Sequence, residues 1–276
     1  QCQNLQTLTV GDGIFDVINN QWSTTAADQC VQRYDDGSYG WVWTRGSAGV
    51  TTPNYPQTLL GTKPWGSDTG TSLFPVQRGS VDQLDLELDV VQEITGGEWN
   101  LAEEWWLTAS EPSGDVSKSI THEVMLVLDW GSYHGHGSVI ESDAITDKYG
   151  NSIDYWANYQ IGWDFHIFRL ASGTPPDIID LTAIMEYMSA NVESVTPELW
   201  MSGIEVGNEY WDNTSGKTVF RQFDVALNGK QVTSGPDNGT DSTTPTPPQN
   251  LTATSQATTV SLDWDKSSDS GGSGLS

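Results

Sequence analysis

Short runs in which apolar and polar residues alternate recur through the first 230 residues of the chain. Alternation with a period of two places every second side chain on one face of an extended strand, and Gly, Asn, Asp and Ser separate the runs. Hydrophobic residues make up 36% of the chain, which is enough for a core. The pattern therefore predicts an all-β fold, a sandwich of two packed sheets. The clearest runs are Tyr39–Trp43, Leu84–Val90, Glu123–Leu128, Phe165–Phe168 and Phe220–Val225.

One segment has helical spacing instead. Pro175 and Pro176 come first, and proline is favoured at the start of a helix. We predict a single helix of about four turns packed on the sandwich. Its apolar residues are Ile178, Ile179, Leu181, Ile184, Met185 and Met188.

The composition changes after residue 230. Residues 231–248 are rich in Ser, Thr, Gly, Pro and Asp and poor in apolar residues, as linkers are. Residues 249–276 hold two strand patterns that resemble the opening strands of a fibronectin type III module, a sandwich of about 100 residues. We therefore expect a domain over 1–230, a linker over 231–248 and a truncated module over 249–276.

The chain is strongly acidic, with 37 Asp and Glu against 11 Lys and Arg, and its net charge is −26. Such a charge repels phosphate backbones and anionic membranes, so we expect neither nucleic acid nor membrane as a partner. The acidic residues are dispersed along the chain, which favours a halophilic source over an ordinary acidic secreted protein. No run of 18 apolar residues occurs, and any export signal is expected to be absent or already removed.

Cys2 and Cys30 are the two cysteines of the sequence. Their spacing matches neither a redox motif nor a zinc motif. An exported protein permits a disulfide, and an N-terminal strand needs an anchor, so we predict a bridge between them. The same reasoning predicts a secreted, extracellular protein.

Several carboxylates lie inside strand patterns, where an unpaired carboxylate is costly to bury. By alternation Glu104 shares a face with Trp106, and Glu205 shares a face with Glu209. Glu123 opens an apolar run. Each could be an outward-facing residue of an acidic protein, and for Glu205 that interpretation is favoured. Together they suit glycoside hydrolysis, which needs one ionised and one protonated carboxyl group beside the glycosidic bond.

The sequence also holds thirteen tryptophans, many beside polar neighbours. Flat aromatic faces suit the apolar faces of sugar rings, although tryptophans can also fill a sandwich core. We expect about a third of them to line a ligand cleft.

Five segments of the sequence form a recognisable series: Asn19–Trp22, Asn54–Gly61 with Lys63–Trp65, Asn100–Trp106, Glu123–Met125 and Gly207–Glu209. They occur in the order found in glycoside hydrolase family 12, and the chain resembles that family over residues 1–230. The resemblance implies a two-sheet β-jelly roll with an open cleft and a retaining endo-1,4-β-glucanase (cellulase) activity.

The resemblance also implies roles for individual residues. Glu123 would be the nucleophile and Glu209 the acid/base, with Glu205 as the alternative acid/base. Glu104 would hydrogen-bond Glu123, although the family usually has Asp there. The family often has Trp where this chain has Val127. The expected sugar-binding residues are Asn20, Trp22, Trp65, Trp106, Met125 and Trp130, the last in place of the missing tryptophan.

Other kinds of site are less favoured. His134 and His136 could suggest a metal pair, but no third ligand is spaced for it, so no metal site is predicted. No GxSxG motif occurs. Because the chemistry needs only carboxyl groups, no cofactor is expected. The expected partner is a β-glucan polysaccharide, and we expect a monomer. The alternatives are a xyloglucan- or mixed-linkage-specific endoglucanase and a non-catalytic glucan-binding sandwich.

Overall fold

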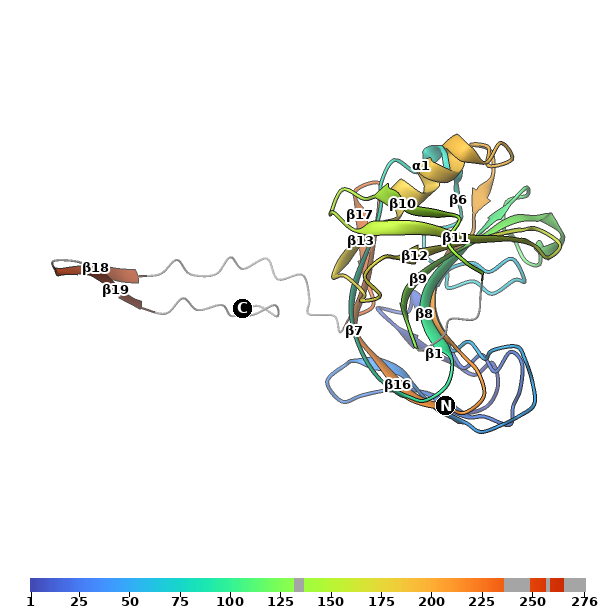
Figure 1. Ribbon diagram of the computed structural model, residues 1–276, viewed down its shortest axis with the longest axis horizontal. Coiled ribbons are helices and arrows are strands. Elements are labelled where there is room, and N and C mark those ends of the chain that lie inside the picture. The colour runs from blue at the N-terminus through green and yellow to red at the C-terminus, as the bar shows by residue number, and fades with distance from the viewer. Residues whose placement is uncertain (132–136, 236–248, 257–258, 266–276) are drawn as a thin grey trace. The chain divides into compact units, whose positions relative to one another are not determined.

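The computed structural model describes residues 1–131, 137–235, 249–256 and 259–265. They form three antiparallel or mixed β-sheets, two 3-10 turns and one α-helix (Figure 1). The chain divides into two units, Gln1–Gly235 and Pro236–Ser276. The first unit is the two-sheet sandwich with one helix that the alternation predicts, so the expected fold class is confirmed.

The larger sheet follows the order β1-β2-β5-β15-β8-β9-β12-β11-β10, with β14 and β6 attached beside β8. All of its pairs are antiparallel except β9 with β12, which is parallel. Its strands are β1 (Thr7–Val10), β2 (Phe15–Ile18), β5 (Gln57–Gly61), β6 (Val76–Gln77), β8 (Trp99–Thr108), β9 (Ile120–Trp130), β10 (Glu141–Thr146), β11 (Ser152–Gln160), β12 (Asp164–Leu170), β14 (Trp200–Met201) and β15 (Gly203–Tyr210).

The smaller sheet follows the order β13-β7-β16-β4-β3, and β17 pairs with β16. Long strands β7 and β16 pair along almost their whole lengths and form its centre. Its strands are β3 (Asp28–Arg33), β4 (Tyr39–Arg45), β7 (Leu84–Thr95), β13 (Ile178–Asp180), β16 (Thr214–Leu227) and β17 (Lys230–Thr233), and the 3-10 turns are Arg78–Ser80 and Ser117–Ser119.

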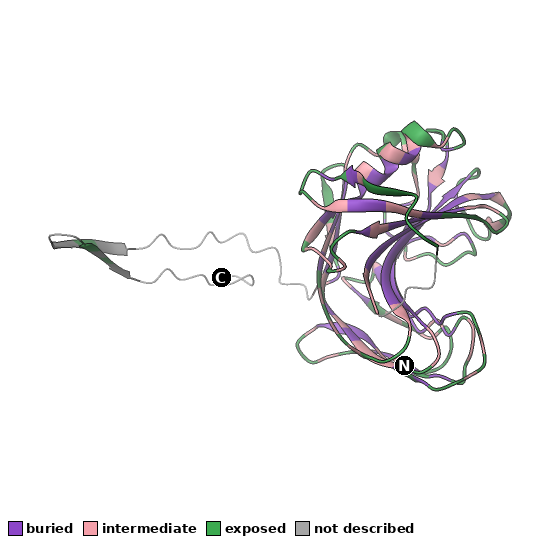
Figure 2. Ribbon diagram, viewed as in Figure 1, coloured by how far each residue is buried: buried purple, intermediate pink, exposed green. Residues whose placement is uncertain are grey.

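The apolar side chains of the larger sheet form two separate clusters, one on each face. Leu101, Trp105 and Leu126 belong to the main core between the sheets. Ala102 and Met125 belong to a second cluster, which lies on the other face. Because neighbouring residues of a strand point to opposite faces, this division identifies the outer face of the larger sheet. We call it the concave face, since β8 and β9 bend around it, and buried residues follow these two strands in Figure 2.

The helix is shorter than expected. Helix α1 spans Leu181–Asn191, about three turns, and the Asp180 side chain caps it by accepting a hydrogen bond from the Thr182 amide at 3.0 Å. Ile178 and Ile179 were predicted to be helical, but they form β13 at the edge of β7. The open edge of β7 offers backbone partners that outweigh local helical spacing. Within the described part of the chain, no helix has the length and apolar character that crossing a bilayer requires.

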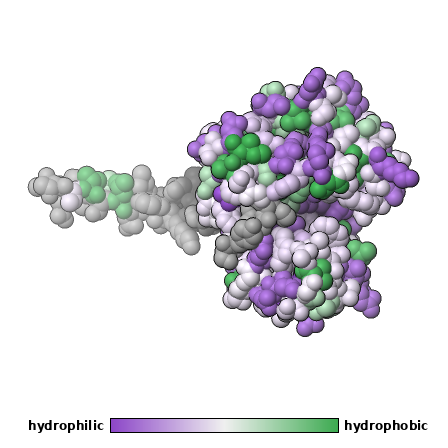
Figure 3. All heavy atoms as spheres, turned by 45° about the vertical axis from the view of Figure 1, so that its right-hand side comes forward, coloured by the Kyte–Doolittle hydropathy of each residue, from purple (hydrophilic) through white to green (hydrophobic). Residues whose placement is uncertain are grey.

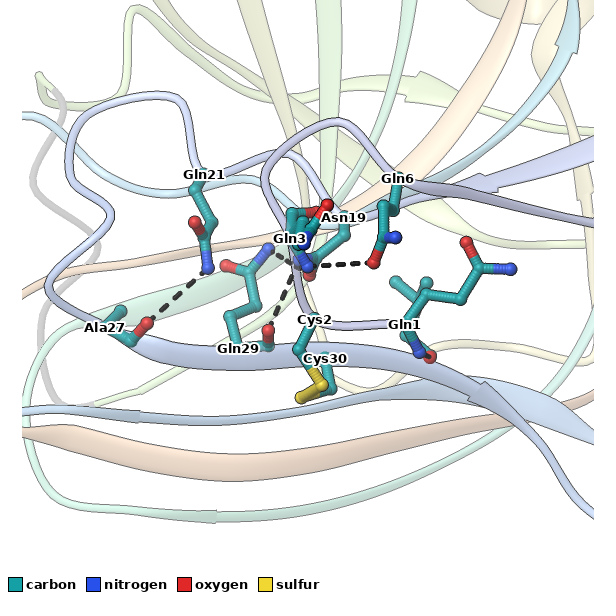
Figure 4. The surroundings of a disulfide bond; sticks show 10 residues. Gln1, Cys2, Gln3, Gln6, Asn19, Gln21, Ala27, Gln29 and Cys30 are labelled. Carbon is teal, nitrogen blue, oxygen red and sulfur yellow. Dashed lines mark hydrogen bonds between the residues drawn. A yellow bond between two sulfur atoms is a disulfide. The ribbon is translucent and has the colours of Figure 1, made fainter.

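The predicted bridge between Cys2 and Cys30 is present and links the N-terminus to β3 (Figure 4). Asn19 strengthens the same region, because its side-chain amide donates to the Gln3 carbonyl at 3.0 Å and accepts from Gln29 at 2.8 Å. The chain before β1 is therefore fixed by a covalent bond and by buried hydrogen bonds.

In the second unit, β18 (Gln249–Gln256) and β19 (Thr259–Asp265) pair antiparallel, at the positions of the two strand patterns in the sequence. Most of the predicted linker, residues 236–248, lies outside the described residues.

Candidate active site

Strands β15, β8 and β9 lie side by side and carry four glutamates on the concave face. Glu205 pairs directly with Glu104 across β15 and β8. On the same face Glu209 pairs with Asn100, and Glu123 of β9 pairs with Trp106. Each of the four glutamates is less than a tenth exposed. Alternation thus brings the three predicted catalytic residues, together with Glu205, to one face of one sheet.

Glu123 is held by an aromatic donor. The indole N–H of Trp163 donates a hydrogen bond to its Oε2 at 2.7 Å. Burial is the main effect that raises the pKa of Glu123; the Trp163 hydrogen bond lowers this pKa, and the charges of Glu209 and Glu205 raise it. The carboxyl is oriented, desolvated and sensitive to the other carboxylates of this face.

Glu209 is held by Asn100 through two hydrogen bonds. The Asn100 amide donates to Oε2 of Glu209 at 2.7 Å, and its carbonyl accepts from the Glu209 backbone amide at 3.3 Å. The pKa of Glu209 is raised to about 7. Burial is the main cause, the Asn100 hydrogen bond opposes it, and the charge of Glu98 adds to it.

Glu205 has a cation of its own. Lys63 Nζ lies 2.6 Å from Oε2 of Glu205, and the Gln57 side-chain amide donates to the same oxygen. Trp106 donates its indole N–H to Oε1 at 3.5 Å. Glu205 thus differs from Glu209 in having a charged partner within hydrogen-bond distance.

Glu104 lies between these groups. Burial raises its pKa well above the ordinary value, and the charge of Glu123 is the next cause. Among the hydrogen bonds of the described residues, none joins Glu104 to Glu123, although the sequence led us to expect one. The two residues occupy diagonal positions on β8 and β9, because Glu104 pairs with Met125. Their interaction in this structure is electrostatic.

Position 207, between Glu205 and Glu209 on β15, holds a glycine because no side chain fits there. A Cβ at this position would lie 2.6 Å from the ring of Tyr55 and 2.6 Å from the Pro56 carbonyl oxygen. Tyr55 is buried, and its hydroxyl donates to the Ala102 carbonyl at 3.5 Å. The glycine in the Gly-x-Glu pattern thus admits a ring that packs between the two carboxylates.

Three tryptophans form an edge-to-face cluster beside Glu123 and Glu205. The ring centroid of Trp106 lies 4.8 Å from that of Trp65 and 5.6 Å from that of Trp163. Trp65 is 47% exposed, so part of its surface is open to a ligand. Trp65 and Trp106 were predicted for sugar binding, and the structure places both at this point.

Two predicted sugar-binding residues precede β3. Asn20 donates to the Gln57 side-chain oxygen at 3.2 Å, which joins it to the polar group around Glu205. Trp22 is 63% exposed, the exposure expected of a stacking platform and not of a core residue.

Met125 and Trp130 lie farther along β9. Met125 is buried in the apolar cluster of the concave face, as a floor residue would be. Trp130 packs its ring 4.4 Å from the guanidinium of Arg169, whose other neighbour is Trp156 at 3.4 Å. A cation therefore already occupies one neighbouring surface of the Trp130 ring.

Glu123 and Glu209 are far apart in strand register. They pair with Trp106 and Asn100, positions six apart on β8, or roughly 20 Å along a straight strand. Only a bent sheet can direct both carboxyls toward one point. Strands β8 and β9 are bent in Figure 1, and the space-filling view shows a hollow between an upper and a lower part of the molecule (Figure 3).

Comparison with solved structures identifies this architecture. A xyloglucanase of Bacillus licheniformis from family 12 superposes with a TM-score of 0.71, at 19% identity, over 82% of this chain and 99% of that one. The fold is that of glycoside hydrolase family 12. The endoglucanase cel12A of Rhodothermus marinus shares the family 12 fold with a TM-score of 0.68 and 21% identity, over 84% of this chain and 98% of that one.

In sequence, Endoglucanase S of Pectobacterium parmentieri is 23% identical over 207 residues, which cover 73% of this chain and 78% of that protein. No model of a protein family matches the chain. The likeness therefore lies in the family 12 fold and in a distant sequence relationship.

Sequence reasoning did not identify Trp163 or Lys63 as neighbours of the glutamates, although Lys63 lies in a segment that resembles the family. Trp163 lies 40 residues from Glu123 in sequence, and only the parallel pairing of β12 with β9 brings them together. His134 and His136 lie outside the described residues. The other two histidines, His122 and His166, meet on the opposite face of the same sheet.

Proposed function

We propose that this chain is a retaining, endo-acting hydrolase of β-1,4-glucan chains. One observation carries the proposal: two buried carboxyl groups, Glu123 and Glu209, lie on the concave face of a bent sheet, and the exposed Trp65 packs against Trp163, the hydrogen-bond donor to Glu123. The family 12 fold supports this assignment, as do the names of the relatives, which are endoglucanases and xyloglucanases.

In the proposed reaction Glu123 attacks the anomeric carbon, and the bond to the leaving sugar breaks. Glu209 gives its proton to the leaving oxygen, and a glycosyl ester of Glu123 forms. A water molecule then loses a proton to Glu209, attacks the same carbon and releases Glu123. Trp163 orients the nucleophile, and Asn100 orients the acid/base. No cofactor takes part in these steps.

The remaining carboxylates are proposed to set the electrostatics. Lys63 neutralises Glu205, so that the concave face does not carry four free negative charges. A protonated Glu104 would be able to donate a hydrogen bond to Glu123 once substrate displaces water. Asn20, Trp22, Trp65 and Trp106 are proposed to contact the sugars.

The decisive experiment replaces the two glutamates one at a time. Glu123→Gln and Glu209→Gln should each abolish the release of reducing sugars, while melting curves show that the fold is kept. Glu111→Gln, at an exposed position, should behave like the wild type. Near wild-type activity of Glu123→Gln contradicts the nucleophile. If Glu205→Gln is inactive and Glu209→Gln is active, the acid/base is Glu205.

The stereochemistry of the product tests the mechanism separately. A retaining reaction requires the two carboxyl groups to lie about 5–5.5 Å apart in the complex with substrate, whereas inversion needs about 6.5–9.5 Å. Proton NMR of the first product formed should show the β-anomer. Formation of the α-anomer would contradict double displacement.

Substrate preference is proposed as cellulose-type β-1,4-glucan, with xyloglucan and mixed-linkage β-glucan as alternatives. The B. licheniformis neighbour is named a xyloglucanase, which supports the first alternative. Reducing-sugar release from a panel of these three soluble polymers separates them. A chain that binds the polymers without cleaving any would instead be a glucan-binding sandwich.

We further propose that the protein comes from a halophilic source, that it is secreted, and that it acts as a monomer. The disulfide between Cys2 and Cys30 supports export, because such bonds persist in oxidising compartments. A polymeric substrate that cannot enter a cell supports it too. The net charge of −26 supports salt adaptation.

A further inference from the structure

A cluster of metal-binding side chains lies behind the proposed nucleophile. His122 of β9 and His166 of β12 face each other with Nδ1 and Nε2 3.3 Å apart. Asp164 Oδ2 lies 3.8 Å from His122 Nδ1, and one ligand atom from each of the three residues lies within 4.8 Å of the other two. Both imidazoles are buried, and the Asp164 side chain is 25% exposed.

The strands explain why these three side chains converge. Asp164 and His166 are two residues apart on β12, so they share a face, and Asp164 is the register partner of His122 on the adjacent parallel strand. Two ligands from one strand and a third from its neighbour form a triangle fixed by backbone hydrogen bonds. Forming a site here needs no movement of the main chain.

The distances suit a tetrahedral metal ion. Zinc binds imidazole nitrogen at about 2.0–2.1 Å, so two nitrogens in a tetrahedral site are roughly 3.3 Å apart. The observed separation of His122 Nδ1 from His166 Nε2 has this value. A rotation of the partly exposed Asp164 side chain would complete three ligands, and its exposure leaves room for a water as the fourth.

The surroundings also suit a metal. Tyr155 Oη and Asn158 Nδ2 each lie 2.9 Å from Nδ1 of His166. With the Asn158 amide turned so that its oxygen faces the ring, Nδ1 of His166 can donate to the tyrosine oxygen, which leaves Nε2 free as a ligand, and metal-binding histidines are usually oriented in this way.

We propose that His122, Asp164 and His166 form a site for a divalent transition metal ion of the zinc type, which fixes β9 to β12. The site lies back to back with the concave face, because His122 precedes Glu123 and Asp164 follows Trp163. It therefore fixes, from the opposite face, strand β9 with Glu123 and the start of β12, which Trp163 directly precedes. This inference does not depend on glucanase activity.

Calorimetric titration of the metal-free full chain with Zn²⁺ tests the proposal. We expect one Zn²⁺ per chain, at least about tenfold weaker binding in Asp164→Asn and His166→Asn, and no comparable binding of Mg²⁺. The chain provides a matched control, because its other two histidines can be removed in His134→Ala/His136→Ala, which should bind Zn²⁺ like the wild type.

Two further measurements keep the test decisive if a variant is less stable. Co²⁺ bound to the wild type should show the visible absorption of a four-coordinate site, and this signal should be lost in Asp164→Asn. Zn²⁺ should raise the melting temperature of the wild type and of the His134/His136 control, but not that of Asp164→Asn. The proposal is overturned if the wild type does not bind one Zn²⁺ per chain. It is also overturned if Zn²⁺ binding is lost in the His134/His136 control and kept in Asp164→Asn.

Discussion

At the scale of single residues, two opposing effects act on the pKa of the Glu209 carboxyl. Burial favours its protonated form, and the hydrogen bond from Asn100 favours its ionised form. In the proposed mechanism the free enzyme needs Glu209 protonated, so activity falls as the pH rises through the pKa of about 7. Burial and the side chain of Asn100 together are thus expected to set the alkaline limit of activity.

Replacing Asn100 by leucine should move that limit. Without the donor the ionised form of Glu209 is less stable, so its pKa rises and the alkaline limb of kcat/KM moves up by about one pH unit. The measurement is the pH profile of kcat/KM on a soluble β-glucan. Asn191→Leu, at the end of α1, serves as the control and should leave the limb in place. If the alkaline limb of Asn100→Leu stays in place or moves to lower pH, Glu209 is not the acid/base.

Glu103 is an acidic residue among the apolar side chains that β8 directs into the core. It points into the core between the sheets, both of its carboxyl oxygens lack hydrogen-bond partners among the described residues, and burial raises its pKa well above the ordinary value. Such a group favours folding below its unfolded-state pKa of about 4.3, and this contribution is lost as the pH rises toward the folded-state pKa.

Glu103→Met should therefore stabilise the protein by about 1–3 kcal/mol at neutral pH, because it removes an unsatisfied buried group. Urea unfolding at pH 5 and at pH 8 measures the change, which should be larger at the higher pH. Glu186→Met, on the exposed side of α1, is the matched control. A destabilised Glu103→Met protein would mean that the carboxyl has a partner when the protein is in solution.

At the scale of elements, the disulfide closes the first three strands into a covalent loop. Cys2 and Cys30 are 28 residues apart, and closing a loop of this length lowers the entropy of the unfolded chain. The Cys2→Ser/Cys30→Ser variant should lose about 3 kcal/mol of unfolding free energy in guanidinium titrations. The hydrogen bonds of Asn19 should keep its folded structure native. An unchanged midpoint would mean that these bonds alone hold the N-terminus.

The strands differ in how far their sequences reveal their roles. The run Glu123–Leu128 predicts the strand, and the period of two places Glu123 on the same face as Met125, which lies in the apolar cluster of the concave face. It does not predict that β9 pairs in parallel with β12, since that pairing depends on the path of the whole chain. Trp163 and the pair of His122 with His166 were missed for this reason. Ile178 was misassigned because its partner, Glu87, is distant in sequence.

At the scale of the whole molecule, the dominant property is the net charge of −26. Folding brings these charges together, and salt screens them: the Debye length falls from about 30 Å at about 10 mM to about 3 Å at about 1 M. The melting temperature should therefore rise between about 10 mM and about 2 M NaCl. If the melting temperature stays constant or falls as salt is added, the acidic surface serves solubility and not stability.

The bend of the larger sheet has a consequence for how such a protein can change. Since Glu123 and Glu209 sit six positions apart along β8, their approach is set by the main-chain curvature and not by either side chain. Core residues beneath β8, such as Trp105 and Leu107, would thus govern the distance between the proposed acid/base and the proposed nucleophile. Slight flattening of the strands would separate these two carboxyls and leave the proposed aromatic platforms in place. A hydrolase could in this way become a lectin through substitutions confined to its interior.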